Sequence, residues 1–179
     1  MCKMQADRRG LKYALYLLIA VISIGVDQLT KYIAVQYLQP IHAYPLWDGV
    51  FQFTYVENRG AAWGMLQGQR WLFLVITVLT TAFIVWYILY DKQMRVLIGV
   101  ALSLIAGGGI GNLIDRMATG AVVDFFHFTL IDFPVFNVAD ICVCVGAGLF
   151  IFAYILDEVA ARKKQQSESA QKEDNRDGE

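Results

Sequence analysis

Long apolar runs separated by short polar stretches dominate the chain. A helix that crosses a membrane needs about 20 mainly apolar residues. Four segments meet or approach this length: Tyr13 to Val35, Trp71 to Tyr90, Val96 to Leu113 and Val138 to Leu156. The second and third contain no charged residue, whereas the first contains Asp27 and Lys31 and the fourth contains Asp140. The pattern predicts four transmembrane helices.

Between the first two spans, a short segment changes its periodicity. Phe51, Phe53 and Tyr55 alternate with polar residues, which is typical of an amphipathic strand, and a turn is expected from Asn58 to Gly60. The predicted fold class is therefore an all-α polytopic membrane protein with four transmembrane helices and a small extracytoplasmic β-strand segment. We expect one membrane domain over residues 1–161. Residues 162–179 are polar and include almost no apolar residue, which predicts a disordered cytoplasmic tail.

Composition supports a membrane protein. Of the 179 residues, 57% are hydrophobic and only 17% are charged, and the mean hydropathy is +0.47. A soluble domain of this size needs more charge to cover its surface, so lipid is the expected solvent around much of the chain. Basic residues are not interleaved with aromatic ones in a patch, so nucleic acid is not an expected partner.

Basic residues predict the orientation. Lys and Arg gather before the first span, in the short connection at Lys92 and Arg95, and after the fourth span at Arg162. With four spans these three places share one side of the membrane, which should be the cytoplasm. Both termini are then cytoplasmic. Arg59, Arg70 and Arg116 lie on the opposite side, so the bias is a majority.

Ionisable residues gather toward the outer ends of the spans. An Asp or Lys at the centre of a membrane helix costs about 2.5 to 3.5 kcal/mol, so each such residue needs a reason. Asp27 and Asp140 both lie toward the outer face, and Asp124 lies among apolar neighbours in the second outer segment. The topology alone therefore brings three carboxylates to one level.

Several of these polar residues can have a structural role instead of a catalytic one. Asp27 and Lys31 are four apart on one helical face and can pair. Arg116 can neutralise Asp115 or meet lipid headgroups. Glycines at 107 and 111 allow close helix packing, which explains them better than a phosphate-binding loop does.

Asp124 and Asp140 suggest chemistry. Two carboxylates that face each other in an apolar setting share a proton, because both cannot ionise cheaply. The ionised group can take a proton from water while the neutral group donates one to a substrate carbonyl. From the residues alone, a proton relay or a structural pair remains an alternative.

Other kinds of site fit less well. His42 and His127 lack a metal-ligand spacing, although Asp124 with His127 could imitate a metal pair. Cys142 and Cys144 lie in an apolar run, where cysteine usually acts as a small apolar side chain. We expect no metal and no cofactor.

Five motifs resemble those of the lipoprotein signal peptidase family, signal peptidase II, and they occur in the family's order. They are Asp27-Gln-Leu-Thr-Lys31, Val56-Glu-Asn-Arg-Gly-Ala-Ala-Trp-Gly64, Gly107-Gly-Gly-Ile-Gly-Asn-Leu-Ile-Asp-Arg116, Val122-Val-Asp-Phe125 and Phe136-Asn-Val-Ala-Asp140. The resemblance covers about residues 13 to 157. Trp63 stands where the family often has Phe, a change between two large aromatic side chains.

The resemblance implies an intramembrane aspartic endopeptidase. Such an enzyme removes the signal peptide from a diacylglyceryl-modified prolipoprotein by cutting just before the lipidated cysteine. Carried over by motif, Asp124 and Asp140 are the catalytic pair. The residues implied to bind substrate or shape the site are Asn58, Gly108, Asn112, Arg116, Asn137 and Ala139, with Asp27, Lys31 and Asp115 in support.

The resemblance also implies a location and partners. The enzyme is expected in the bacterial cytoplasmic (inner) membrane as a multi-pass protein, with its active site at the outer, periplasmic face. Its partners are lipidated prolipoproteins and membrane lipids, and we expect a monomer. The rival interpretations are a small proton-coupled transporter and a non-enzymatic assembly factor. A transporter favours internal repeats and polar groups near the membrane midplane, whereas this chain has dissimilar halves and polar groups at one face.

Overall fold

The computed structural model describes residues 2–61 and 65–177, so Trp63 lies outside the described residues. Its four long helices are α1 (Cys2–Ile33), α2 (Arg70–Tyr90), α3 (Val96–Ala118) and α4 (Val138–Asp177). By length and composition, each contributes one candidate membrane span: Arg9–Leu38, Arg70–Tyr90, Val96–Ala118 and Val138–Lys163. The predicted fold class is confirmed.

Helix α3 is the central helix of the bundle, because its small residues let neighbours approach closely. A Cβ atom added to Gly107 would lie 2.8 Å from the Ser23 side chain of α1, and one added to Gly108 would lie 2.3 Å from the Ala139 carbonyl oxygen of α4. Close approach of backbones through small residues is how membrane helices pack without a hydrophobic driving force. The glycines therefore serve packing, as expected.

Helix α2 lies at the edge of the bundle. Ile84 is its one buried residue, and large apolar side chains such as Val78, Leu79 and Phe83 are exposed. A helix that is apolar all round and exposed in this way is suited to lipid. Its first residue is held to the end of α3, because Arg70 Nη2 donates to the Met117 carbonyl oxygen at 2.8 Å.

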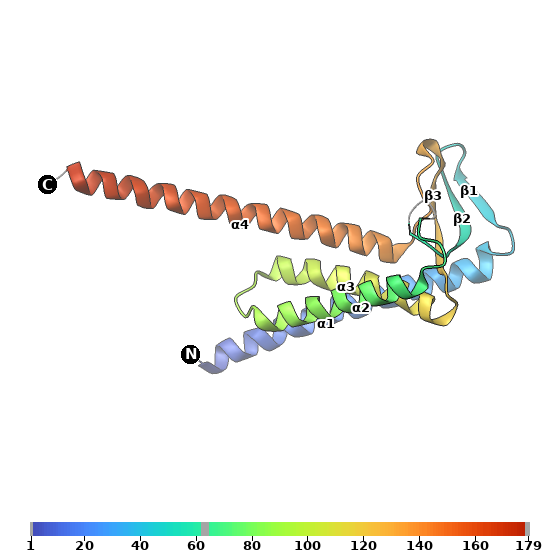
Figure 1. Cartoon of the computed structure of the whole chain (residues 1–179), viewed down its shortest axis with the longest axis horizontal. Coiled ribbons are helices and arrows are strands. Elements are labelled where there is room, and N and C mark those ends of the chain that lie inside the picture. Colours follow the sequence, from blue (N-terminus) through green and yellow to red (C-terminus); the bar gives the residue numbers. More distant parts are fainter. Residues whose placement is uncertain (1, 62–64, 178–179) are drawn as a thin grey trace.

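A three-stranded antiparallel sheet covers one end of the bundle (Figure 1). Its strands are β1 (Ala43–Trp47), β2 (Phe51–Asn58) and β3 (Val122–Phe128), in that order. The alternating pattern indicated β2 alone. β3 pairs with it from about 70 residues away, and Val56 lies opposite Asp124. A bulge in β2 between Phe53 and Val56 sets this register.

Short helical turns join the bundle to the sheet. The π-helical turn η1 (Ala34–Leu38) extends α1 toward β1, and the 3-10 turn η3 (Thr129–Ile131) follows β3. The beginning of α1, the α2–α3 connection and the later part of α4 lie at the end opposite the sheet (Figure 1).

The polar segment after residue 161, for which the sequence predicts a disordered tail, is helical in the structure. Helix α4 continues through Asp177. Most residues from 162 to 177 are good helix formers such as Arg, Lys, Gln and Glu, and no Gly or Pro occurs there to end the helix. Arg162 also pairs with Glu158 one turn earlier at 2.9 Å. The division at residue 161 stays a prediction.

Candidate active site

Helix α4 begins with a reciprocal cap that fixes Asp140. The Asn137 side-chain oxygen accepts the Asp140 N–H at 3.0 Å, and the Asp140 carboxylate accepts the Asn137 N–H at 3.1 Å. This is a capping-box arrangement, with Asn and Asp in place of the commoner residue types. It holds the Asp140 carboxylate at a helix N-terminus, where the backbone dipoles favour negative charge.

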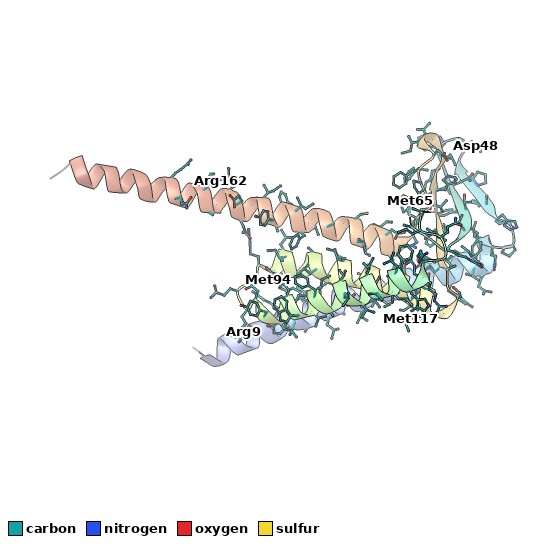
Figure 2. All side chains as sticks on the ribbon, in the orientation of Figure 1. Arg9, Asp48, Met65, Met94, Met117 and Arg162 are labelled. Atoms are coloured by element: carbon teal, nitrogen blue, oxygen red, sulfur yellow. The ribbon has the colours of Figure 1, made fainter. Side chains whose placement is uncertain are left out.

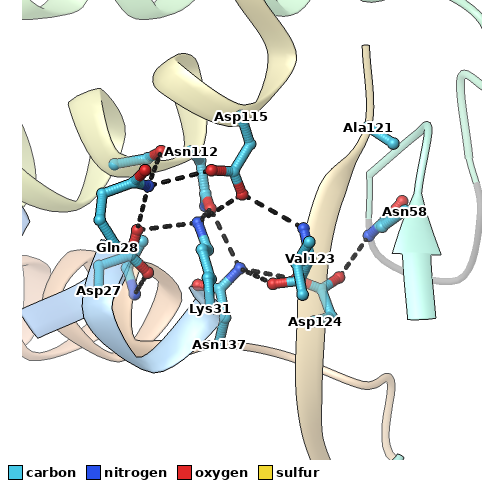
Figure 3. Close-up of polar contacts among 12 residues, drawn as sticks. Asp27, Gln28, Lys31, Asn58, Asn112, Asp115, Ala121, Val123, Asp124 and Asn137 are labelled. Atoms are coloured by element: carbon cyan, nitrogen blue, oxygen red, sulfur yellow. Dashed lines mark hydrogen bonds and ion pairs between the residues drawn. The ribbon is translucent and has the colours of Figure 1, made fainter. Parts of the chain in front are cut away.

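Asp124 reaches the same place from β3. Its Oδ2 accepts a hydrogen bond from Asn58 Nδ2 on β2 at 2.9 Å, and its Oδ1 accepts one from Asn137 Nδ2 at 2.6 Å (Figure 3). Asp124 is only 2% exposed and Asn137 is fully buried. Sheet pairing and the helix cap together orient this carboxylate.

Asn112 of α3 completes the donor set. Its Nδ2 donates to Asp140 Oδ1 at 2.9 Å, so each of the four carboxylate oxygens of Asp124 and Asp140 accepts one hydrogen bond. Its Oδ1 accepts from Lys31 Nζ at 2.8 Å and from Asn137 Nδ2 at 3.0 Å. Asn112 therefore links the carboxylates to a buried cation.

Both carboxylates line one hollow of about 190 Å³, which we call the carboxylate pocket. Its other polar lining side chains are Asn58, Asn112 and Arg116, and the remainder of its wall comes from Gly60, Ala61, Val122, Phe133, Pro134, Val135 and Phe136. A few convergent polar groups inside an apolar wall are typical of a ligand site.

The surroundings of Asp124 raise its pKa from 3.8 to about 7. Burial is the largest cause, and the negative charge of Asp140 acts in the same direction. Hydrogen bonds from Asn58 and Asn137, and the positive charge of Lys31, lower the pKa in part. A carboxyl group with a pKa near 7 can hold or release a proton at physiological pH.

Lys31 is the cation of a buried network behind the pocket. Its Nζ lies 2.8 Å from Asp27 Oδ2 and 2.9 Å from Asp115 Oδ2. Gln28 Nε2 also donates to both aspartates, at 3.2 Å and 3.0 Å (Figure 3). The expected Asp27–Lys31 pair is present, and it extends to a third charged residue on α3.

Asp27 also braces the start of α4. Its Oδ1 accepts the Ala139 N–H at 2.9 Å, and it is fully buried. Ala139 is fully buried too, and it packs against Gly108. Gly108 and Ala139 therefore lie at the helix contact behind the pocket and shape the site without lining it.

Arg116 does not pair with Asp115, the partner considered from the sequence, but contacts Gly60 and Phe73. Its Nη2 donates to the Gly60 carbonyl oxygen at 3.1 Å, and its guanidinium carbon lies 4.6 Å from the centre of the Phe73 ring. Asp115 instead takes Lys31 as its cation. Arg116 thus points into the carboxylate pocket.

His127 does not join Asp124 in a metal pair. Its Nδ1 lies 3.2 Å from Thr54 Oγ1 and 3.3 Å from Gln52 Nε2. Residues three apart on a strand face opposite sides of the sheet, so Asp124 and His127 point away from each other.

Comparison with known proteins decides the family. The family model described as signal peptidase (SPase) II matches residues 19–156. A lipoprotein signal peptidase of Bacillus pumilus is 46% identical over 144 residues, which is 79% of this chain and 93% of that protein. One of Bacillus subtilis is 44% identical over 154 residues, 84% of this chain and 99% of that protein. The chain belongs to the signal peptidase II family.

Solved structures agree with this membership. A bacterial membrane enzyme determined by the in meso method at 2.3 Å resolution superposes with a TM-score of 0.75 at 36% identity, covering 81% of this chain and 90% of the other. Signal peptidase II enzymes are proteases that cleave the signal peptides of prolipoproteins. The resemblance, the enzyme class and the general function inferred from the five motifs are confirmed, whereas the role of each site residue stays a prediction.

Sequence reasoning gave no role to several residues of this signal peptidase II site. Gln28 is the second residue of the motif Asp27-Gln-Leu-Thr-Lys31. It could have been singled out from the sequence, because a polar side chain within an apolar span is unusual. Its Nε2 joins Asp27 to Asp115 and to the Gly111 carbonyl oxygen. Phe73 and the Gly60 carbonyl gave no such signal, because an aromatic residue and a backbone group are common everywhere.

Proposed function

We propose that Asp124 and Asp140 are the catalytic pair of an aspartic endopeptidase, which cuts a diacylglyceryl prolipoprotein just before its lipidated cysteine. The observation that carries this proposal is the carboxylate pocket. Two acidic groups from distant chain segments line one hollow there, and every oxygen of both is held by a hydrogen-bond donor.

The chemistry follows from two different carboxyl groups. Asp140, at a helix N-terminus, begins ionised and takes a proton from a water as that water attacks the scissile carbonyl carbon. Asp124, whose pKa is raised to about 7, begins protonated and donates to the carbonyl oxygen. Asp140 then gives its proton to the leaving nitrogen as the C–N bond breaks, and Asp124 regains one from the diol.

The amide side chains keep this pair in place. Asn58 donates to Asp124 and Asn112 donates to Asp140, so neither carboxylate can turn without losing a partner. Arg116 uses Nη2 for the Gly60 carbonyl oxygen, and its guanidinium offers further N–H donors. We assign those donors to backbone or ester oxygens of the substrate.

A second hollow supports a lipidated substrate and membrane lipids as partners. An apolar groove of about 490 Å³ lies between the end of the first span and the sheet, lined among others by Ile33, Tyr37, Leu38 and Phe125. Phe125 and Asp124 are adjacent on β3 and face opposite sides of it. The groove therefore gives acyl chains an apolar surface beside the strand that carries Asp124.

The membrane orientation is also part of the proposal. This is a multi-pass inner-membrane protein, and we place the sheet and the carboxylate pocket at its outer face with both termini in the cytoplasm. Arg9, Lys12 and Lys92 gather at the end opposite the sheet, as cytoplasmic residues should. That the enzyme acts as a monomer stays a prediction.

The proposal is tested with purified protein and a synthetic precursor. The precursor carries diacylglycerol on its cysteine, and a matched precursor lacks it. We expect a product that begins at the modified cysteine, with turnover falling sharply on the unlipidated precursor because the pocket lies at bilayer depth. Equal rates on the two precursors would count against an interfacial, lipid-dependent site, and cleavage elsewhere would overturn the assigned bond.

A further inference from the structure

A small hollow lies at the end of the bundle opposite the carboxylate pocket. It is formed between the start of the first span and the α2–α3 connection, and encloses about 10 Å³. We call it the basic hollow, and its polar lining residues are Arg9, Lys12, Tyr13, Tyr16, Asp91 and Lys92. Figure 2 shows Arg9 and Met94 together at this end, far from Asp48 in the turn between β1 and β2.

The residues of α1 that line the basic hollow lie on one face of that helix. Arg9, Lys12, Tyr13 and Tyr16 follow one another at intervals of three, one and three residues, so their side chains form a stripe along about two turns. The α2–α3 connection closes over this stripe with Lys92 and the buried Met94.

The buried hydroxyl group of Tyr16 is a second, independent indication that the basic hollow binds a ligand. The residue is 4% exposed, and within the described part of the chain its hydroxyl has no hydrogen-bond partner. Gly99 makes room for the ring, because a Cβ there would lie 2.5 Å from the hydroxyl oxygen. Buried hydroxyl groups are almost always hydrogen-bonded, so this one calls for an acceptor.

The charges around the hydroxyl favour an anionic acceptor. Arg9, Lys12 and Lys92 give three positive charges against the single carboxylate of Asp91, a balance of +2. Asp91 already accepts the Gln93 N–H at 3.0 Å. Among the described ion pairs none uses these three cations, although Arg95 and Arg162 at the same end are both paired.

We propose that the basic hollow binds the phosphate group of an anionic phospholipid. The enclosed space admits about one oxygen atom, which fits one phosphate oxygen accepting the Tyr16 hydroxyl hydrogen. Arg9 and Lys92 are exposed, and long Arg and Lys side chains have several rotatable bonds, so they can turn aside to admit the phosphate and then contact its other oxygens. The exposed apolar side chains of Leu11 and Leu15 beside the stripe suit the acyl chains, which a free phosphate lacks.

Such a lipid would join α1 to the α2–α3 connection. It would act at the basic end of the molecule, where the anionic leaflet attracts Lys and Arg. The proposal concerns lipid binding and the packing of the bundle, and it stands or falls independently of the catalytic roles of Asp124 and Asp140.

The test measures the affinity of the full-length protein, in zwitterionic micelles, for phosphatidylglycerol by native mass spectrometry. Replacing two basic contacts with Lys12→Gln and Lys92→Gln should weaken binding about 30-fold. Tyr16→Phe should weaken it about tenfold through loss of one hydrogen bond to a charged group, and should not unfold the protein, because the ring is kept. Lys163→Gln, an exposed lysine on α4 outside the hollow, is the matched control.

Two further arms identify the ligand. Inorganic phosphate and phosphatidylcholine should not compete with phosphatidylglycerol at the same concentrations. Equal competition by inorganic phosphate would overturn the lipid assignment. Unchanged phosphatidylglycerol affinity in both the lysine variant and Tyr16→Phe would overturn the site itself.

Discussion

Asp124 and Asp140 are the same amino acid in two different electrostatic settings. Asp140 accepts the Asn137 N–H at the start of a helix, which favours its charge. Asp124 is buried on a strand beside another carboxylate, and its pKa rises to about 7. We infer that at neutral pH Asp140 holds the charge and Asp124 the proton, so one acid and one base face the substrate.

The first prediction is that these two residues act as one unit. Asp124→Asn, Asp140→Asn and the double change should each reduce cleavage to about the same floor, because an amide cannot exchange a proton with water or substrate. Each variant should still insert and fold, since Asn keeps the volume and the change removes a buried acid. The measurement is cleavage of lipidated precursor by purified, folded variants.

Asp27→Asn provides the contrast for that experiment. Asp27 pairs with Lys31 and accepts the Ala139 N–H, both away from the carboxylate pocket. Its loss should lower stability and reduce activity only in part. Substantial cleavage by either Asp124→Asn or Asp140→Asn at equal protein level would remove that residue from the catalytic role.

The second prediction concerns pH. If Asp124 must hold a proton, kcat should fall as pH rises through about 7, the pKa that burial sets for this group. The Asn58 hydrogen bond lowers that pKa, so Asn58→Ala should raise it and move the alkaline limb to higher pH, while kcat itself falls. The measurement is the pH profile of kcat for both proteins. A limb that stays in place or moves to lower pH contradicts the assigned role of Asp124 or of Asn58.

At the scale of elements, the site depends on how closely α1, α3 and α4 approach. Gly111 of α3 faces Asp27, and a Cβ at this position would lie 2.5 Å from Asp27 Oδ2. Asp27 in turn holds the Ala139 N–H of α4. One glycine therefore allows a carboxylate on the first helix to brace the helix that carries Asp140.

The third prediction follows from this contact. Gly111→Ala should destabilise the protein by about 1 to 3 kcal/mol, as overpacking does, because the added methyl meets a fully buried carboxylate. It should also lower activity by displacing the start of α4. Gly109→Ala is the matched control, since its Cβ would meet only Thr77 Cγ2 at an ordinary 3.4 Å. Thermal unfolding in detergent compares the two, and equal stability would contradict the packing argument.

At the scale of the whole molecule, polar groups are divided between its two ends. The sheet occupies one end, and Arg9 lies at the other (Figures 1 and 2). The carboxylate pocket is lined by residues of the sheet, whereas Lys12 and Lys92 line the basic hollow with Arg9. Clusters of Lys and Arg favour the cytoplasmic side of a membrane. In the proposed orientation, the carboxylate pocket would meet substrates at the outer face of the membrane.

The fourth prediction tests that orientation. A reporter fused after Glu179 should be active only in its cytoplasmic form, because α4 crosses the membrane from the sheet end to the basic end. A second fusion in the outer segment, after Asp48, should give the opposite result. Periplasmic activity of the fusion after Glu179 would mean that the number of spans is wrong.

The sequence by itself determined the solvent and the spans of this protein, and it singled out its candidate reacting groups. Long apolar runs dictate helices because the lipid interior offers no partners for backbone N–H and C=O groups. An aspartate inside such a run needs a reason, so Asp27 and Asp140 stood out without any structure. The motifs then indicated the family and, with it, the chemistry.

Only the tertiary structure decided which polar groups meet. The pairing of β3 with β2 joins segments about 70 residues apart. The alternation of residues in β3 does not show which strand it pairs with, and it leaves open a register shift by an even number of residues. The same is true of Lys31, which takes Asp115 from α3 as well as its helical neighbour Asp27. Local spacing determines contacts within one helix, whereas contacts between helices depend on how small residues such as Gly108 and Gly111 let the backbones approach, and that is settled only when the whole bundle packs.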